Sequence, residues 1–298
     1  MVGRARRQPR HLPGRLAVER YVVTLRCRDR PGIVRALSEA VFELKGNIVE
    51  SQQFFDDRSG TFCLRMTFDS PETDVDAART ELGTRLAAFE PALKVRPIGD
   101  RPRVLVMVSR ADHCLEDLLY RRRIGELPID VPLVVSNHDG ARGEVERHGI
   151  EFEYVPVTPD SKPAAEARLL ALIAEHRIDL VVLARYMQVL SDDLCRALDG
   201  RAINIHHSFL PGFKGARPYH QAHLRGVKLI GATAHYVTAE LDEGPIIEQD
   251  VVRVDHHHGP EQLVALGRDV ERMVLARAVR LHAEDRVLRN GDRTVVFA

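Results

Sequence analysis

Several features that would mark a special class of protein are missing from this chain of 298 residues. Lysine and arginine number 43, aspartate and glutamate also number 43, and the formal net charge is therefore zero. Nothing in the bulk charge calls for a nucleic acid or a membrane surface as a partner. No apolar run reaches the roughly 18 residues that a membrane-spanning helix needs. We expect a cytoplasmic protein that binds neither nucleic acid nor membrane.

Cysteine is scarce and scattered. The four cysteines are Cys27, Cys63, Cys114 and Cys195, and no two of them form a C-x-x-C pair. This spacing argues against a zinc site and against a disulfide framework. It favours a reducing compartment.

Composition and pattern divide the chain into a tail, two domains and a linker, and the length fits two domains. Residues 1–18 are rich in arginine and lack hydrophobic periodicity, which predicts a disordered tail. Residues 19–98 and 103–298 each carry periodic apolar patterns. Residues 99–102 are polar and contain glycine and proline, so we interpret them as the linker.

The first domain is predicted to have the element order β-α-β-β-α-β, the ferredoxin-like arrangement. The expected strands are Tyr21–Leu25, Ile48–Phe55, Thr61–Phe68 and Leu93–Ile98, and the expected helices run from Ile33 to Leu44 and from Pro71 to Ala88. Gly46 follows the first helix and is expected to cap it.

Two motifs in this domain, Asp29-x-Pro31-Gly32-Ile33-Val34 and Gly46-Asn47-Ile48, resemble the ACT domain, a small regulatory module. ACT modules pair side by side and bind an amino acid at the join. The resemblance thus implies a homo-oligomer (dimer or tetramer) and an amino-acid effector site. Its residues would be Asp29, Gly32, Ile33, Asn47 and Ile48. Gly32 lets backbone N–H groups approach a carboxylate at a helix N-terminus, although plain turn and cap chemistry is the alternative.

Strands and helices alternate through the second domain, which predicts a doubly wound, mostly parallel α/β sheet. The expected strands are 103–109, 131–136, 152–155 and 180–184, with helices 115–122, 140–148 and 163–176 between them. A long helix over Glu261–Leu288 and a last strand over Thr294–Phe297 are expected to close the domain.

Glycine is absent from the loop after the first strand of this domain, Ser109 to Cys114. A phosphate or nucleotide site would favour a glycine-rich loop there, so a backbone cradle for phosphate is not expected. His113 and Cys114 suggest a nucleophile pair, but neighbours in sequence seldom face one another.

The stretch Ile203–Gly215 carries the chemistry around which the second domain is organised. Asn204, His206 and Ser208 alternate, so in a strand they share one face where the strand runs out into a loop. Asp242 lies in an acidic turn between two later apolar runs. An amide, an imidazole and a carboxylate suffice for acyl transfer or hydrolysis, because they can stabilise an oxyanion and activate an attacking group.

Four separated motifs resemble the folate-dependent formyltransferase family over roughly residues 103–255. They are Asn204-Ile205-His206, Leu210-Pro211-x-Phe213-x-Gly215, Gly231-Ala232-Thr233-Ala234-His235 and Leu241-Asp242-x-Gly244-Pro245-Ile246-Ile247. The resemblance implies that Asn204, His206 and Asp242 are catalytic. It also implies a pterin slot formed by Met187, Gln188, Val189, Leu190, Thr238, Glu240 and Leu241, with His235 supporting the site through Asp242 or the substrate.

The branch of this family that the chain resembles hydrolyses 10-formyltetrahydrofolate to formate and tetrahydrofolate. An ACT-like module precedes its catalytic domain, and the glycine-rich phosphate loop of the amine-formylating branch is replaced here by Ser109–Cys114. Water is therefore the expected acceptor, the folate is the substrate, and no cofactor or metal is expected. Formyl transfer to an amine acceptor and an inactive amino-acid sensor remain the alternatives.

In the expected mechanism Asp242 positions and deprotonates water, either directly or through His206, with its pKa raised by an apolar pterin slot. Asn204 and His206 stabilise the oxyanion. His207 is expected to face the opposite side of the strand and to be structural, and Ser208 either orients Asn204 or caps the next turn. Lys214 is either a contact for the folate's glutamate tail or a solvated lysine. The run His256-His257-His258 is expected to be a surface loop and not a metal site.

Overall fold

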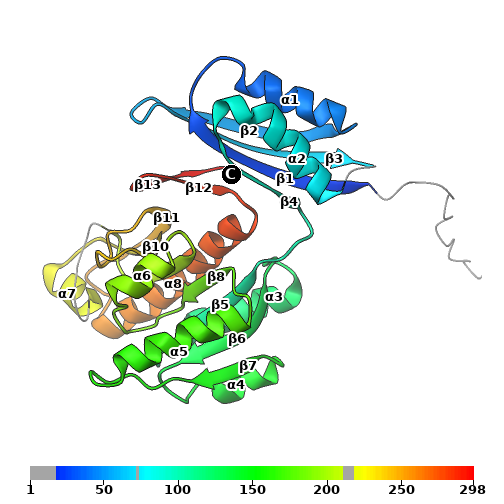
Figure 1. Cartoon of the computed structure of the whole chain (residues 1–298). Helices are drawn as coiled ribbons and strands as arrows, with labels where there is room; N and C mark the ends of the chain where they lie inside the picture. Colours follow the sequence, from blue (N-terminus) through cyan, green and yellow to red (C-terminus); the bar gives the residue numbers. More distant parts are fainter. Residues whose placement is uncertain (1–17, 72–73, 211–217) are drawn as a thin grey trace, which may run out of the picture. The chain divides into compact units, whose positions relative to one another are not determined.

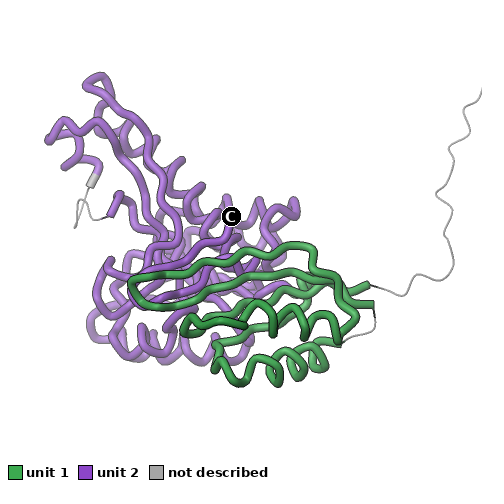
Figure 2. Tube along the Cα trace, turned by 90° about the horizontal axis from the view of Figure 1, so that it is seen from above, with its two compact units in different colours: residues 1–100 green, residues 101–298 purple. Residues whose placement is uncertain are grey.

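The computed structural model describes residues 18–71, 74–210 and 218–298 (Figure 1). The chain separates into two compact units, one up to Asp100 and one from Arg101 onward, coloured separately in Figure 2. The predicted tail falls almost wholly on residues 1–17, outside the described residues. No helix in the described ranges is long and apolar enough to cross a membrane.

The first unit has the element order predicted for it. Its elements are β1 (Glu19–Arg28), α1 (Ile33–Glu43), β2 (Asn47–Asp56), β3 (Thr61–Ser70), α2 (Val75–Leu86), a 3₁₀ turn (Ala87–Phe89) and β4 (Ala92–Pro97). The sheet order is β2-β3-β1-β4, and every pairing is antiparallel. Tyr21, Val23 and Leu25 alternate along β1 and are fully buried in one core with residues of both helices. Period-two alternation thus places one face of this sheet against the helices.

The end of α1 differs from the prediction that Gly46 caps the helix. The left-handed residue there is Lys45, with φ 52°, and Gly46 does not have positive φ. Glycine is needed at 46 for another reason. An added Cβ would lie 2.8 Å from a methyl of Val41 and 2.9 Å from the ring of Phe68. Close packing, and not backbone conformation, selects the glycine.

The second unit contains a seven-stranded sheet, as the doubly wound prediction requires. Its strands are β5 (Arg103–Val108), β6 (Asp130–Ser136), β7 (Glu151–Tyr154), β8 (Leu180–Leu183), β9 (Ala202–His206), β10 (Leu229–Tyr236) and β11 (Ile246–Arg253). The order is β11-β10-β9-β8-β5-β6-β7. The strands from β9 to β7 run parallel, and at one edge β10 pairs antiparallel with both β9 and β11.

Helices cover both faces of this sheet. They are α3 (His113–Ile124), α4 (Arg142–Arg147), α5 (Lys162–Glu175), α6 (Asp192–Ala197), α7 (Pro218–Arg225) and α8 (Pro260–Ala283). Val104 and Val106 of β5 share a core with α3, α4 and α8. Leu105 and Met107 of the same strand share another core with α5 and α6. The sheet is thus buried on both sides, which explains the uncharged run of β8.

The C-terminal elements correct the predicted helix Glu261–Leu288. α8 ends at Ala283, and Asp285 takes a left-handed φ of 53° just beyond it. A short strand β12 (Val287–Asn290) follows and pairs with β13 (Arg293–Val296). The apolar residues of β12 continue the helical spacing by coincidence, which is why periodicity alone extends the helix too far.

Candidate active site

The candidate catalytic residues come together where strands of the parallel sheet end. Asn204 and His206 lie on β9, the parallel strand that borders β10. In the β9–β10 register Asn204 is opposite His235, and His206 is opposite Thr233. Asp242 lies in the turn between β10 and β11. The carboxyl end of a parallel sheet is where open α/β folds place their sites, and the predicted shared face of Asn204 and His206 puts both there.

His206 and Asp242 form the central pair of the site. His206 Nδ1 lies 3.2 Å from Asp242 Oδ1, and the imidazole is buried. The other ring nitrogen of His206, Nε2, is also buried and has no hydrogen-bond partner within the described ranges. An imidazole held by a carboxylate on one nitrogen and free on the other can accept a proton at the free one.

The turn that carries Asp242 is tight. Asp242 has a left-handed φ of 59°, a conformation that aspartate tolerates better than most residues. Two residues later, a Cβ on Gly244 would lie 1.7 Å from the carbonyl oxygen of Tyr236. Glycine at 244 and aspartate at 242 are therefore the residues that let the turn close over the end of β10.

His235 fixes the orientation of Asn204. Its Nδ1 lies 2.9 Å from the carbonyl oxygen of Tyr236, a distance at which Nδ1–H donates to it. Nε2 then has a lone pair for the Asn204 amide, whose Nδ2 lies 3.2 Å away. Asp242 Oδ1 is farther from Nε2, at 3.7 Å. The support expected of His235 is thus directed mainly at the Asn204 amide, with Asp242 as a longer-range contact.

The pKa of Asp242 corrects the prediction that an apolar slot raises it. Contacts with His206 and then His235 lower the pKa of this carboxyl far below its ordinary range, and they outweigh the opposing effect of burial. The hydrogen bond from His206 to the charged form is the largest effect and exceeds desolvation. Asp242 is therefore a stable carboxylate and a weak base.

A cavity of about 610 Å³ opens beside these residues. Its lining includes the catalytic candidates and every residue predicted to bind the substrate: Met187, Gln188, Val189, Leu190, His235, Thr238, Glu240 and Leu241. Met187, Val189 and Leu241 expose 58%, 59% and 63% of their surface, and all three lie at this one cavity. The structure thus brings the residues predicted to form the slot together around one cavity, and apolar side chains form its rim.

The loop without glycine has a structural use that the sequence did not reveal. Ser109 Oγ accepts a hydrogen bond of 2.9 Å from the backbone N–H of Met187 and donates one of 2.7 Å to Asn137 Oδ1. This buried hydroxyl anchors the start of the slot segment to the end of β5. Ser109 therefore supports the slot.

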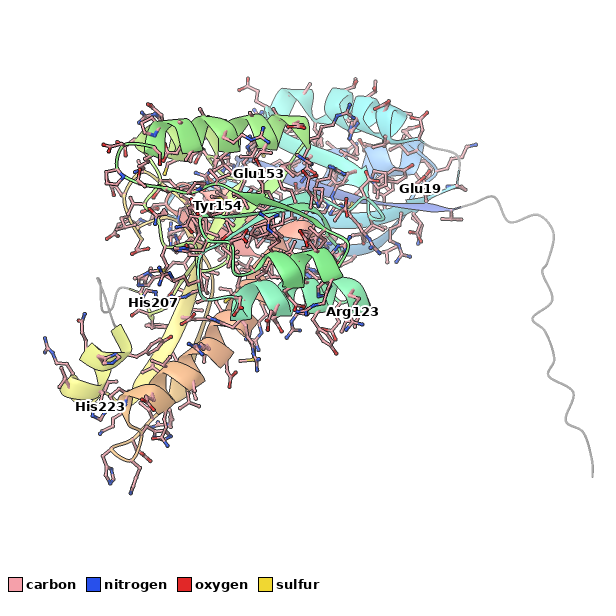
Figure 3. The ribbon with its side chains drawn as sticks, turned by 90° about the horizontal axis from the view of Figure 1, so that it is seen from below. Glu19, Arg123, Glu153, Tyr154, His207 and His223 are labelled. Carbon is pink, nitrogen blue, oxygen red and sulfur yellow. The ribbon has the colours of Figure 1, made fainter. Side chains whose placement is uncertain are left out.

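His207 corrects the expectation that it faces away from the site. It directly follows the last residue of β9 and is labelled in Figure 3. Strand alternation ends at His206, and His207 lines the same cavity. Burial and, secondly, Arg185 lower the pKa of His207 to about 4, so the imidazole is neutral at pH 7. Ser208 is buried, and its carbonyl oxygen accepts a hydrogen bond of 3.0 Å from Thr233.

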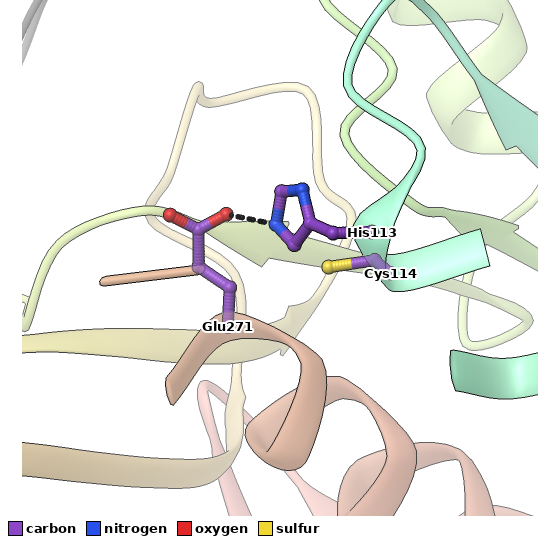
Figure 4. Close-up of side chains that lie close together, drawn as sticks. All are labelled: His113, Cys114 and Glu271. Carbon is purple, nitrogen blue, oxygen red and sulfur yellow. Dashed lines mark hydrogen bonds and ion pairs between the residues drawn. The ribbon is translucent and has the colours of Figure 1, made fainter. Parts of the chain in front are cut away.

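His113 and Cys114 do not form a nucleophile pair. His113 Nε2 lies 2.9 Å from Glu271 Oε2, as drawn in Figure 4. Cys114 is fully buried, and burial raises the pKa of its thiol well above the ordinary value. His, Cys and Glu are metal-ligand types, and their donor atoms lie within 4.8 Å of one another. However, Arg185 Nε stands 3.3 Å from Glu271 Oε2, and a guanidinium there opposes a second cation.

The histidine run lies in the turn after β11, as predicted for a surface loop. His257 exposes 76% of its side chain, and Asp255, His256 and His257 are all exposed. None of the three histidines lines the cavity. The motif positions Pro211, Phe213, Lys214 and Gly215 lie outside the described residues.

The predicted effector residues lie at the first turn of α1 and the start of β2. Gly32 precedes the helix with a left-handed φ of 101°, which favours glycine. Its carbonyl oxygen accepts a hydrogen bond of 2.9 Å from Ala36 N–H, and no side chain caps the helix. Ile33 is buried, whereas Asp29, Asn47 and Ile48 are exposed.

Sequence reasoning missed three residues that line the cavity near His207: Arg185, Tyr219 and Glu271. Arg185 was identifiable as the first charged residue after the uncharged strand β8. Glu271 lies one turn after Gly267 on α8, and this spacing is visible in the sequence. The contact between Tyr219 and Glu271, 52 residues apart, has no local signal.

Comparison with known proteins gives a consistent result. The family described as formyl transferase matches residues 102–279. A formyltetrahydrofolate deformylase from Corynebacterium sp. (strain P-1) is 53% identical over 280 residues, covering 93% of this chain and 98% of the relative. The crystal structure of a formyltetrahydrofolate deformylase from Burkholderia mallei is 50% identical with a TM-score of 0.91, covering 94% of this chain and 100% of that one. A glycinamide ribonucleotide transformylase from Symbiobacterium toebii is 33% identical with a TM-score of 0.62, and covers 66% of this chain and 95% of that one.

Proposed function

The chain belongs to the formyl transferase family, among its formyltetrahydrofolate deformylases, and we propose that Asn204, His206 and Asp242 carry the hydrolysis of 10-formyltetrahydrofolate. The products are formate and tetrahydrofolate, so the enzyme would supply formate to one-carbon metabolism and purine synthesis. The observation that carries the residue assignment is the His206–Asp242 pair at 3.2 Å, beside an amide that His235 orients.

The proposed base is His206 and not Asp242. His206 Nε2 takes a proton from water as the water oxygen attacks the formyl carbon. Nδ1 of His206 keeps its own proton and continues to donate it in a hydrogen bond to the Asp242 carboxylate. That carboxylate stabilises the imidazolium that forms. The proton then passes to N10 of the folate as the bond between carbon and N10 breaks. Formate and tetrahydrofolate leave, and His206 returns to its neutral form.

Asn204 is proposed to stabilise the oxyanion of the tetrahedral intermediate. One N–H of its amide is held by His235, which leaves the other available to the formyl oxygen. An amide fixed in advance costs no reorganisation at the moment of reaction. Removing one such donor typically lowers the rate by about 100- to 1,000-fold.

We propose that the substrate's pterin ring occupies the slot between residues 187–190 and 238–241. Its apolar rim suits the faces of a flat ring, and the backbone polar groups of the two segments suit its edge. No cofactor or metal has a step in this mechanism. Four free cysteines, all buried, are consistent with the cytoplasm as the site of the reaction.

The first unit is proposed to be an ACT-like regulatory module that pairs with a second copy and binds an amino acid near Gly32 and Asn47. Titrating hydrolysis with glycine or methionine tests this proposal, and about 5- to 150-fold is the usual scale of such coupling. Gly32→Ala should abolish the response. Gly125→Ala is the matched control, because Gly125 also has positive φ but lies at the end of α3 in the second unit. A response that persists in Gly32→Ala would remove the site from this turn.

The decisive test of the enzymatic proposal needs no acceptor. Purified enzyme is incubated with 10-formyltetrahydrofolate alone, and formate and tetrahydrofolate are measured together. We expect both in equal amounts, and loss of both in His206→Gln. His257→Gln is the matched control, since His257 is exposed and lies outside the cavity. Turnover that requires an added amine would instead identify a transferase.

A further inference from the structure

A buried carboxylate that is held by other side chains of the protein lines the same cavity as the catalytic residues. Glu271 of α8 is 1% exposed. Its Oε1 accepts a hydrogen bond of 2.6 Å from the hydroxyl of Tyr219. Its Oε2 lies 2.9 Å from His113 Nε2 and 3.3 Å from Arg185 Nε. We call these four residues the Glu271 network.

Glu271 is charged and Tyr219 is neutral in this network. Burial works to raise the pKa of Glu271, but His113, Arg185 and Tyr219 together bring it below its ordinary value, so the carboxylate is charged. Burial and then Glu271 raise the pKa of Tyr219 far above its ordinary value, so the phenol is protonated and donates. Two hydrogen bonds, from His113 and Tyr219, hold the anion, and Arg185 adds a positive charge at 3.3 Å without a hydrogen bond. Losing either hydrogen bond would leave a buried polar group unpaired.

The position of Tyr219 is built into α8 and does not depend on the hydrogen bond alone. A Cβ added to Gly267 would lie 2.1 Å from Cζ and 2.2 Å from the hydroxyl of Tyr219. The ring therefore lies directly on the backbone of α8, one turn before Glu271 and on the same face. Glycine at 267 makes room for the tyrosine that contacts the carboxylate.

The network adjoins the catalytic residues through His207. The His207 ring centroid lies 5.2 Å from that of His206 and 6.4 Å from that of Tyr219. His113, Arg185, Tyr219 and Glu271 line one cavity with His206 and Asp242. The proposed folate slot and the Glu271 network thus line the same cavity as the catalytic residues.

We propose that the Glu271 network determines the acceptor of the formyl group, by keeping the space beside His207 closed to amines and open to water. This inference rests on the proposed hydrolysis. A primary amine of several atoms would need the volume that Tyr219 fills. It would also need a free acceptor for its N–H groups, and both oxygens of Glu271 are already engaged. Water needs neither.

Removing or displacing Tyr219 should therefore let an amine accept the formyl group. The amine nitrogen would attack the formyl carbon and lose a proton to His206, and N10 would take that proton as its bond to carbon breaks. The products would be an N-formylated amine and tetrahydrofolate. The solved transformylase that shares this fold shows by its name that a related chain formylates an amine-bearing ribonucleotide.

The experiment measures how the full-length enzyme partitions the formyl group between water and glycinamide. Tyr219→Ala removes the ring, and Gly267→Ala displaces it while keeping every polar group. Tyr154→Ala and Gly143→Ala are the matched controls, because Tyr154 is 46% exposed and an added Cβ at Gly143 meets nothing within 4 Å. Formate and N-formylglycinamide are quantified by mass spectrometry, and circular dichroism checks the fold.

We expect no N-formylglycinamide from the wild type or the controls. Tyr219→Ala and Gly267→Ala should raise the ratio of N-formylglycinamide to formate at least about tenfold over background, the low end of what altered pocket contacts give. If Tyr219→Ala does not fold, His113→Ala takes its place, since it frees Glu271 Oε2 from the other side.

Two results would overturn the proposal. One is transfer to glycinamide by the wild type, and the other is the absence of transfer in folded variants that still release formate. Failure of the proposed hydrolysis has a different signature, because the wild type would then release no formate even without glycinamide.

Discussion

Two aspartate–histidine groups in the second unit look alike in distance and differ in surroundings. In one, His206 Nδ1 lies 3.2 Å from Asp242 Oδ1, and in the other, His258 Nδ1 lies 2.8 Å from Asp255 Oδ1. Both aspartates have lowered pKa values, chiefly from hydrogen bonding. The shorter contact belongs to an exposed turn, and the longer one lies beside a cavity. A short contact therefore does not by itself mark a catalytic pair.

Burial and an uncommitted nitrogen separate the two groups. His206 keeps a buried Nε2 free of partners in the described part of the chain, whereas His258 and Asp255 are 31% and 54% exposed to water. Water screens the exposed group and weakens its contacts. The buried group has a fixed orientation and a low-dielectric setting, in which a proton transfer can be directed. Four predictions test this contrast, beginning with the largest expected effect.

Asp242→Asn should lower the rate of formate release by about 100- to 1,000-fold, because the amide cannot stabilise the imidazolium of His206. Asparagine tolerates left-handed φ as aspartate does, so the turn should keep its shape. Steady-state kinetics give the measurement, and Asp255→Asn is the control that should match the wild type. A rate above about a tenth of wild type in Asp242→Asn would contradict the role given to the carboxylate.

His235→Phe should lower kcat by up to about 100-fold, with a smaller change in KM, because the Asn204 amide loses the contact that orients it. His235→Gln should recover part of the rate, since its side chain can again accept from that amide. His258→Phe, on the exposed group, should have no effect. Equal losses in His235→Phe and His235→Gln would show that only bulk matters at this position.

The two aspartates should differ in how they contribute to stability as pH falls. The folded-state pKa of Asp242 is depressed, so its contribution is present above the ordinary aspartate pKa of about 3.9 and is lost as pH falls toward the folded value. Urea unfolding at pH 7 and pH 3 should therefore show a larger loss for the wild type than for Asp242→Asn. Asp255→Asn should follow the wild type, because an exposed pair contributes little. Parallel losses in the wild type and Asp242→Asn would refute this account.

Chelation should have the smallest effect, namely none. Asn204, His206 and Asp242 act without an ion in the proposed mechanism, so exhaustive dialysis against a chelator should leave the rate unchanged. The measurement is formate release before and after dialysis, with and without added zinc. Loss of activity that zinc restores would revive the exposed histidine group, or the group of His113, Cys114 and Glu271, as a metal site.

The part of this site that could be predicted from the sequence is the part that local periodicity determines. Alternation along β9 places Asn204 and His206 on one side, and the turn before β11 brings Asp242 to them. Periodicity fails where an element ends, and it therefore misplaced His207 and extended α8 beyond Ala283. The doubly wound, mostly parallel arrangement followed from the regular alternation of strands and helices.

Properties that depend on contacts between distant segments were not predictable. The direction of the Asp242 pKa shift depends chiefly on the hydrogen bond from His206 on β9, which outweighs the effect of burial. The Glu271 network joins residues from four separate segments, and only the spacing of Gly267 and Glu271 is local. The glycine at 46 was recognised, but its reason, contact with Phe68 on β3, is a tertiary one.

The exposed apolar rim of the slot has a calorimetric consequence. Met187, Val189 and Leu241 lie more than half in water without a ligand, and a flat aromatic ring would remove much of that surface from water. Apolar surface that leaves water lowers the heat capacity, so ligand binding here should become more exothermic as temperature rises. Met187 also has a thioether exposed to oxidants, and an occupied slot should shield its sulfur from conversion to the sulfoxide.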